Sequence, residues 1–105
     1  MFKIIFSDID GTLLNADRDL SKYTIETIEK LSKADIPFIL ISSRMPAAMR
    51  HLQKKMNIEH LPLISYNGGL ILVDGKPVSS TEIPIEILTQ LHQFNQDHDV
   101  HLSLF

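Results

Sequence analysis

The stretch SDIDGTLL, residues 7–14, places two acidic residues directly after an apolar run. The run before it is rich in β-branched and aromatic residues, so residues 3–9 are predicted to form a buried strand. A strand that ends on two carboxylates is costly to fold unless a ligand or a reaction uses them. Asp8 and Asp10 are therefore the first candidate functional residues of the chain.

Two further apolar segments follow, and each of them ends in polar residues. Phe38–Ile41 runs into Ser42-Ser43-Arg44, and residues 61–66 run into Asn67-Gly68. Helical spacing of apolar residues fills the two gaps, from an N-cap at Ser21 to about residue 34 and again from Pro46. This β-α-β-α-β order predicts an α/β fold, with a parallel sheet covered by helices.

The carboxyl ends of parallel strands meet at one edge of a sheet, which is where ligands bind in such folds. We therefore expect the polar clusters after the three strands to surround one crevice. Carboxylates, hydroxyls, a guanidinium and free backbone amides in one crevice favour a phosphorylated ligand.

Four other segments carry weaker predictions. Residues 10–20 are rich in turn formers and are expected to form a turn-rich excursion, of which a small hairpin is one form. Residues 70–79 are expected to form a hairpin around Asp74-Gly75. A helix with an apolar stripe is predicted from Pro84. Residues 100–105 alternate between apolar and polar side chains and are predicted to form a strand.

Composition excludes several classes of function. A net charge of −3 without a basic cluster argues against a nucleic-acid partner, and zero cysteines exclude disulfide frameworks and thiolate zinc sites. No apolar stretch approaches the roughly 20 residues that span a bilayer, and two aspartates interrupt the N-terminal apolar run. We expect a soluble, cytoplasmic protein with no membrane or nucleic-acid partner.

The pattern D-x-D-G-T over residues 8–12 fixes four positions out of five. By average composition, about one chain in a thousand of this length would contain it by chance. It resembles the first motif of the haloacid dehalogenase superfamily of phosphohydrolases and phosphotransferases. The resemblance continues in ISSRMP at residues 41–46 and in SYNGGLI at residues 65–71, which are similar to the Cof-type branch. Members of that branch dephosphorylate small metabolites such as sugar phosphates.

The resemblance implies a role for each aspartate. Asp8 would be the nucleophile that forms an aspartyl-phosphate, and Asp10 would be the general acid and then the base that activates water. The implied cofactor is Mg²⁺, bound by the Asp8 side chain and the Asp10 backbone carbonyl. Two carboxylates this close repel each other, so one of their pKa values is expected to rise.

The resemblance also implies a phosphate- and substrate-binding set. Ser42 stands where the family uses a hydroxyl to hold the phosphoryl group, and Arg44 would lie near the substrate or brace the loop. Ser43 replaces the glycine that is usual between them, which reduces the freedom of the loop backbone. The remaining members of the set are Gly11 and Thr12, through their backbone amides, and Asn67 and Gly68, at the border of the pocket.

The family pattern also requires a later lysine and a later acidic motif. After residue 69 the only lysine is Lys76, in the predicted hairpin, and Asp97 and Asp99 lie in what resembles the start of a cap. The expected organisation is therefore a partial Rossmann-like core over residues 1–81 and the beginning of a truncated α+β cap over residues 82–105. Such a chain is expected to be a poor phosphatase on its own, or none.

Alternatives from other classes remain. A receiver-like signalling domain also takes up phosphate on an aspartate at a strand end, although Asp10 would then have no role. A catalytically inactive module that binds phosphometabolites or a partner is the third reading. In the family's sheet the aspartate-bearing strand is central, and its neighbour on one side comes from a part absent here. Residues 3–9 would then form an exposed apolar edge strand, and we expect self-association through it.

Overall fold

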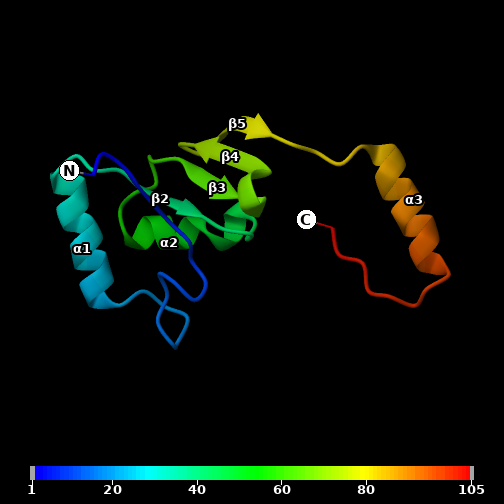
Figure 1. The fold of residues 1–105 in the computed structure, drawn as a ribbon, viewed down its shortest axis with the longest axis horizontal. Helices are drawn as coiled ribbons and strands as arrows, with labels where there is room; N and C mark the ends of the chain where they lie inside the picture. Colours follow the sequence, from blue (N-terminus) through cyan, green and yellow to red (C-terminus); the bar gives the residue numbers. More distant parts are fainter. Residues whose placement is uncertain (1, 105) are drawn as a thin grey trace.

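The computed structural model describes residues 2–104 and contains one five-stranded sheet in the order β1-β2-β3-β4-β5 (Figure 1). The first three strands are mutually parallel, and β4 and β5 continue the sheet antiparallel. The predicted α/β class is therefore confirmed, as a mixed sheet. The strands are β1 (Ile5–Ser7), β2 (Phe38–Ile41), β3 (Leu63–Ser65), β4 (Leu70–Val73) and β5 (Lys76–Ser80).

Helices connect the parallel strands, as the sequence predicts. Helix α1 (Lys22–Lys33) joins β1 to β2, and its N-cap Ser21 accepts a hydrogen bond from the Thr24 amide. The connection from β2 to β3 begins with the 3₁₀ helix η1 (Pro46–Ala48), in which Pro46 takes the first position, and continues as α2 (Arg50–Lys55).

The hydrophobic core lies between one face of the sheet and the two helices. Phe38 and Leu40 of β2, together with Leu63 of β3, point into it and meet Ile28 of α1 and Leu52 of α2. Alternate residues point to the other face, where Phe6 pairs with Ile39 across β1 and β2. Further buried members of the core are Ile9, Leu20, Met49, Met56, Ile58 and Leu72.

A hairpin closes the sheet on the side away from β1. Asp74 and Gly75 form its turn with φ values of 52° and 78°, both in the left-handed region typical of tight hairpin turns. A second 3₁₀ turn, η2 (Tyr66–Gly68), connects β3 to β4. The hairpin predicted over residues 70–79 is therefore confirmed.

Four predicted elements differ from the structure. The strands expected over residues 3–9 and 61–66 are only three residues long each. Residues 10–20 form turns instead of a hairpin, because the Asn15 side chain accepts the amides of Asp17 and Asp19. Residues 100–104 contain no strand, and Phe105, the last residue of that prediction, lies outside the described residues.

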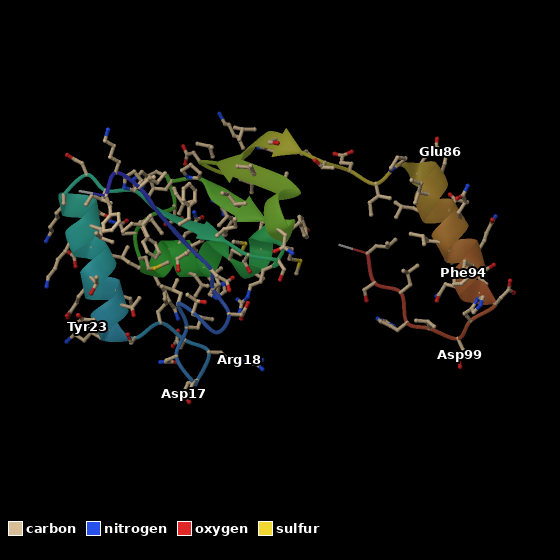
Figure 2. The ribbon with its side chains drawn as sticks, viewed as in Figure 1. Asp17, Arg18, Tyr23, Glu86, Phe94 and Asp99 are labelled. Atoms are coloured by element: carbon tan, nitrogen blue, oxygen red, sulfur yellow. The ribbon has the colours of Figure 1, made fainter. Side chains whose placement is uncertain are left out.

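The segment after β5 leaves the sheet. Residues 81–84 lead to α3 (Ile85–Gln96), which stands apart from the sheet and the other two helices (Figure 1). Side chains extend from α3 on all sides, Phe94 and Glu86 among them, and none of its residues is buried (Figure 2). In the part of the chain that is described, no helix is long and apolar enough to cross a membrane.

Candidate active site

The three polar clusters named by the sequence lie at the carboxyl ends of β1, β2 and β3. Asp8 follows β1, Ser42 follows β2, and Tyr66 follows β3. Backbone hydrogen bonds join the last two loops: the Asn67 amide donates to the Ser42 carbonyl at 2.9 Å and the Tyr66 amide to the Arg44 carbonyl at 3.1 Å. The parallel register thus brings the second and third clusters into direct contact.

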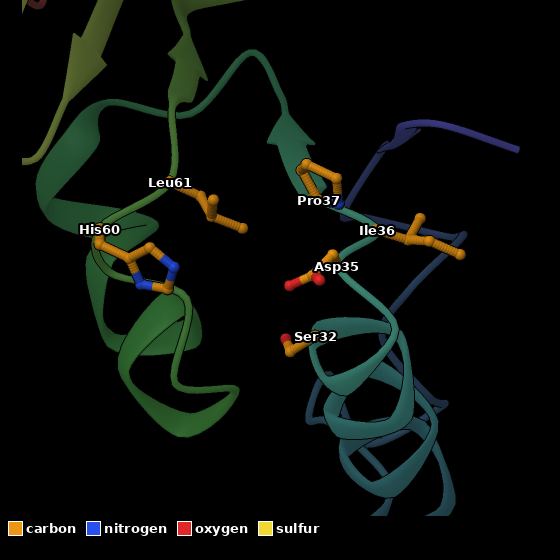
Figure 3. A pocket seen from close by; sticks show the side chains of 6 residues that line it. All are labelled: Ser32, Asp35, Ile36, Pro37, His60 and Leu61. Carbon is orange, nitrogen blue, oxygen red and sulfur yellow. The ribbon is translucent and has the colours of Figure 1, made fainter.

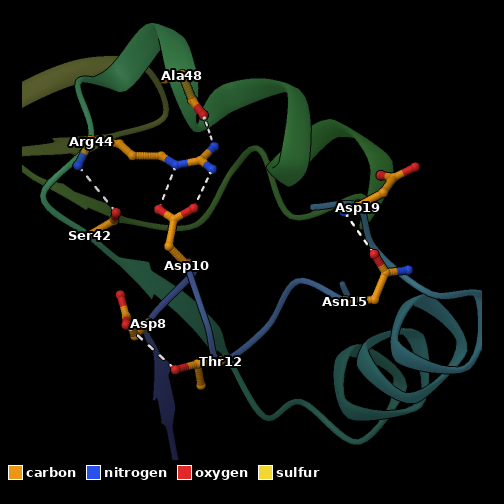
Figure 4. A network of polar contacts seen from close by, with 8 residues as sticks. All are labelled: Asp8, Asp10, Thr12, Asn15, Asp19, Ser42, Arg44 and Ala48. Atoms are coloured by element: carbon orange, nitrogen blue, oxygen red, sulfur yellow. Dashed lines mark hydrogen bonds and ion pairs between the residues drawn. The ribbon is translucent and has the colours of Figure 1, made fainter. Parts of the chain in front are cut away.

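Arg44 joins the first cluster to the other two. Its Nε and Nη2 donate to the two carboxylate oxygens of Asp10 at 2.8 and 2.6 Å, and its Nη1 donates to the Ala48 carbonyl at 3.1 Å (Figure 4). This bidentate geometry is the strong form of an arginine–carboxylate pair. Arg44 was expected either to lie near the substrate or to brace the loop. In the structure it braces the loop, through its contacts with Asp10 and Ala48.

The electrostatics of the aspartate pair differ from the expectation. The two hydrogen bonds from Arg44 hold the pKa of Asp10 below its ordinary value, which keeps this carboxylate ionised. The rise predicted for one pKa of the pair is therefore not found at Asp10, where the hydrogen bonds from the Arg44 guanidinium are the largest influence and lower the pKa. The same contact raises the pKa of Arg44.

Asp8 is the free carboxylate of the pair. Its side chain is exposed, and the Thr12 hydroxyl is 3.5 Å from its Oδ2, at the outer limit of a hydrogen bond. Figure 4 shows the Asp8 side chain below those of Ser42 and Asp10, with its dashed contact to Thr12 and none to Arg44. An ionisable oxygen without strong partners at a strand end is available to attack a ligand or to bind a cation.

The turn after Asp10 is built on one carbonyl. The amides of Thr12, Leu13 and Leu14 all donate to the Ile9 carbonyl, at 3.0 to 3.3 Å. The Thr12 amide, expected to face a phosphate, is therefore already used by the turn. Gly11 has φ +76°, a left-handed value that favours glycine, and the space where a Cβ would stand is open.

Ser42 is buried, and the amide of Arg44 donates to its Oγ at 3.2 Å. Its hydroxyl proton remains available to a ligand oxygen, which is what a phosphate-holding serine requires. Ser43 and Asn67 are exposed beside it, and Gly68 is partly buried with φ +96°. Tyr66, Asn67 and Gly68 are three consecutive left-handed residues, a strained turn of the kind that gathers at functional sites.

The groups that could bind a cation at this site are of the type that Mg²⁺ prefers. The exposed Asp8 carboxylate and the Asp10 carbonyl are hard oxygen ligands, and Mg²⁺ keeps several waters when proteins bind it. The Asp10 side chain is turned to Arg44, so only its carbonyl remains for a cation. Within residues 2–104 no group of three or more His, Asp or Glu side chains could enclose a metal ion.

Two hollows lie outside this cluster. A small pocket of about 180 Å³ is found at the amino ends of β2 and β3, the opposite edge of the sheet, between Asp35 and His60 (Figure 3). A larger groove of about 780 Å³ begins at Tyr66, beside the candidate site. It passes over the β4–β5 hairpin to Leu88 of α3.

Comparison with known proteins places this geometry in a family. The family model of the haloacid dehalogenase-like hydrolases matches residues 5–105. The chain belongs to this family. The expected family resemblance is therefore confirmed, and Asp8, Asp10, Ser42 and Asn67 all lie within the matched residues.

Individual relatives give the same assignment. A proposed phosphatase of Haemophilus influenzae is 30% identical over 99 residues, which are 93% of this chain and 37% of that protein. The crystal structure of a haloacid dehalogenase-like hydrolase from Bacteroides thetaiotaomicron is also similar, with 25% sequence identity and a TM-score of 0.86. This match covers 92% of this chain and 38% of the Bacteroides protein. A protein of known crystal structure from Geobacillus kaustophilus is 26% identical, with a TM-score of 0.85, and the match covers 94% of this chain and 38% of that protein. The chain thus spans less than two-fifths of the length of these relatives.

The sequence missed one part of the site. Nothing in the pattern pairs Asp10 with Arg44, because the two residues are 34 positions apart and their contact depends on the loop between β2 and η1. The assignment of residues 1–81 to a core and of residues 82–105 to a cap stays a prediction.

Proposed function

We propose that this chain carries the nucleophile half of a phosphomonoesterase site, with Asp8 as the group that accepts the phosphoryl moiety. The observation that supports the proposal most is the free Asp8 carboxylate beside the arginine-held Asp10 at the ends of the parallel strands. In a haloacid dehalogenase-like hydrolase, this pair is the motif of an aspartyl-phosphate mechanism. The substrate class we infer is a small phosphorylated metabolite, as in the Cof-type branch.

The chemistry proceeds in two displacements. An Asp8 oxygen attacks phosphorus, the bond from phosphorus to the leaving oxygen breaks, and that oxygen takes a proton from Asp10. Water then attacks the same phosphorus, gives its proton to Asp10, and the bond to Asp8 breaks to release phosphate. Mg²⁺, held by the Asp8 carboxylate and the Asp10 carbonyl, would supply positive charge that offsets the repulsion between carboxylate and phosphate.

Arg44 sets a condition on the first displacement. Asp10 must carry a proton to act as an acid, yet the two hydrogen bonds from Arg44 favour its ionised form. Protonation of Asp10 weakens both contacts, because the charge-assisted pair with Arg44 becomes a pair with a neutral carboxyl group. The geometry therefore suits the base role directly, and the acid role requires the Arg44 pair to weaken.

The test is phosphate release from a panel of small phosphate esters with and without added Mg²⁺. Because the chain carries only part of the site, we expect slow Mg²⁺-dependent release from the wild type, and we expect that release to be lost in Asp8→Asn. Asp17→Asn is the matched control, since Asp17 is an exposed aspartate in the nearby turn. Release that is equal in wild type and Asp8→Asn would contradict the proposal.

A second candidate is a module that takes up phosphate without turnover. It is favoured by the small number of cation ligands in residues 2–104 and by the arginine that holds Asp10. Labelling with a phosphoryl donor separates the two candidates. Stoichiometric acyl-phosphate on Asp8 without release supports the second, and continuous release supports the first.

A further inference from the structure

The small pocket at the amino ends of β2 and β3 lies at the opposite edge of the sheet from the candidate active site. It holds about 180 Å³ and is lined by Ser32, Asp35, Ile36, Pro37, His60 and Leu61 (Figure 3). The last turn of α1 and the segments that precede two neighbouring parallel strands therefore form it. None of its walls belongs to the candidate site or to α3.

The wall on the α1 side is fixed by the way the helix ends. The Asp35 amide donates to the Ser32 carbonyl at 3.1 Å. The Ile36 amide donates to the Leu31 carbonyl at 3.0 Å. Asp35 has φ 56°, and a left-handed residue with these hydrogen bonds is a common end of an α-helix. The backbone that carries the Asp35 carboxylate is thus held in one conformation.

The wall on the β3 side is fixed by a buried glutamine. Gln53 of α2 is 1% exposed, and its Nε2 donates to the Leu61 carbonyl at 3.3 Å. The Leu61 amide donates to the Ile58 carbonyl, and the Ile58 amide donates to the Gln53 carbonyl, both at 3.0 Å. His60 stands between these two residues, so its backbone is fixed as well. The pocket is therefore already formed without a ligand.

Polar side chains face each other across the pocket. Figure 3 shows the Asp35 carboxylate and the His60 imidazole on opposite walls, with the Ser32 hydroxyl beside Asp35. No ion pair among residues 2–104 uses Asp35, and Lys33 of the same turn pairs with Glu29 at 3.4 Å. A carboxylate, a neutral imidazole and a hydroxyl can each accept a hydrogen bond. The rim of the pocket thus offers acceptors to a ligand that donates.

The charge of the pocket is negative. Asp35 is the acidic residue among those that line it, and the carboxyl end of α1 adds the partial negative charge of the helix dipole at the same wall. The other lining residues are apolar and partly buried, and they form an apolar floor: Ile36, Pro37 and Leu61. A matching ligand combines a cationic donor group with a short apolar part.

From this combination we infer that the pocket binds a primary ammonium group on a short alkyl stem. The three N–H donors of the ammonium match the acceptors of Asp35, His60 and Ser32, and the stem packs on the apolar floor. A volume of about 180 Å³ admits a stem of a few carbon atoms, since sites for drug-sized ligands begin at roughly 300 Å³.

A metal ion is the competing occupant, because carboxylate and imidazole groups are also metal ligands. Two observations favour the ammonium group. Within residues 2–104 no group of three or more His, Asp or Glu side chains could enclose a metal ion. The apolar floor also gives nothing to a hydrated ion, whereas it removes an alkyl stem from water.

NMR titration of the 105-residue chain with butylammonium chloride tests the inference. At about pH 8, where histidine side chains are ordinarily neutral, we expect saturable shifts of the Asp35, Ile36 and Leu61 amides. The amides of Gly11 and Asn67, in the candidate active site, are expected to stay unchanged. Millimolar affinity is within reach of so small a ligand. Butan-1-ol has the same stem without the charge and is expected to cause far smaller shifts.

Variants separate the charge from the fold. Asp35→Asn removes the charge and keeps a residue type that tolerates a left-handed φ, and we expect it to raise the dissociation constant roughly three- to tenfold. Asp74→Asn is the matched control, since Asp74 is also exposed and has φ 52°. It is expected to bind like the wild type. His60→Phe keeps a ring without an acceptor and is expected to weaken binding roughly twofold.

The same ammonium group occurs on free amines and on lysine side chains. Nα-acetyllysine amide carries it on a peptide backbone, so its affinity relative to butylammonium distinguishes the two sources. Absence of saturable shifts with both compounds would overturn the inference, as would equal affinity in Asp35→Asn and the wild type. Shifts at the lining residues that Zn²⁺ causes and neither amine causes would assign the pocket to a metal ion instead. These measurements do not involve phosphate release, so the inference and the proposed function fail separately.

Discussion

Arg44 makes the two aspartates of the motif chemically unequal. It binds both oxygens of Asp10 and leaves Asp8 with only the long contact from Thr12. One carboxylate is therefore fixed in position and ionised, and the other is free to react. This asymmetry suits a division in which Asp8 is the nucleophile and the ionised Asp10 is the base, whereas the acid role of Asp10 works against its pair with Arg44.

The pH dependence of stability measures the Asp10–Arg44 pair. Its hydrogen bonds hold the pKa of Asp10 below its ordinary value of 3.8 in the folded chain. Because the folded-state pKa is lowered, the pair stabilises the fold above that ordinary value, and the contribution is lost as pH falls through the folded-state pKa. We expect the difference in unfolding free energy between wild type and Arg44→Gln to be constant between about pH 5 and 7 and to shrink below about pH 4.

Urea unfolding at several pH values, followed by circular dichroism, checks this prediction. Arg44→Gln also removes the hydrogen bond to the Ala48 carbonyl, whose contribution does not depend on pH in this range. A difference that stays constant down to about pH 2.5 would mean that only the Ala48 contact matters.

At this scale the sequence predicted residue types better than contacts. The strand-end position of Asp8, Asp10, Ser42 and Asn67 follows from apolar runs that stop at polar residues. The Arg44 contact does not follow, because no periodicity relates two loop residues that are 34 positions apart. A side chain in a loop is placed by the path of that loop, which local patterns leave open.

At the scale of elements, helix α1 was predicted closely because its signals are local. Ser21 caps the first turn, apolar residues recur at helical spacing, and the chain leaves the helix before Pro37. The strand predicted over residues 100–105 fails for the opposite reason. Its alternating pattern is correct for a strand, but residues 100–104 have no neighbouring strand to pair with in the described chain. Strands depend on partners that a sequence window does not contain.

The cap of α1 gives the prediction for this scale. The Oγ of Ser21 accepts the Thr24 amide at 3.1 Å and its proton is donated to the Thr24 hydroxyl at 2.9 Å. Ser21→Ala is expected to lower the free energy of unfolding by about 1 kcal/mol, the usual effect of losing a serine cap. Ser32→Ala, an exposed position in the last turn of the same helix, is the matched control and is expected to change it little. Equal losses in the two variants would show that the cap contributes nothing specific.

At the scale of the whole molecule, the chain is more extended than a compact domain of the same length. The radius of gyration is 17.0 Å, against about 13 Å for a compact domain of 105 residues. The excess comes from α3, which stands away from the sheet, while the segment after it turns back towards the sheet (Figure 1). Stability must therefore reside between β1 and β5, where all the buried hydrophobic residues are found. The apolar face of α3 contributes little to it.

A pair of matched truncations tests this distribution. Ile58 is 0% exposed within the core, so Ile58→Ala is expected to lower the free energy of unfolding by about 2–5 kcal/mol through lost burial and a cavity. Leu91 is 46% exposed on α3, and Leu91→Ala is expected to change the free energy by less than about 0.5 kcal/mol. Denaturant unfolding at a single dilute concentration keeps association out of the comparison. A large loss in Leu91→Ala would mean that α3 packs against the sheet in solution, and the extended arrangement would then be wrong.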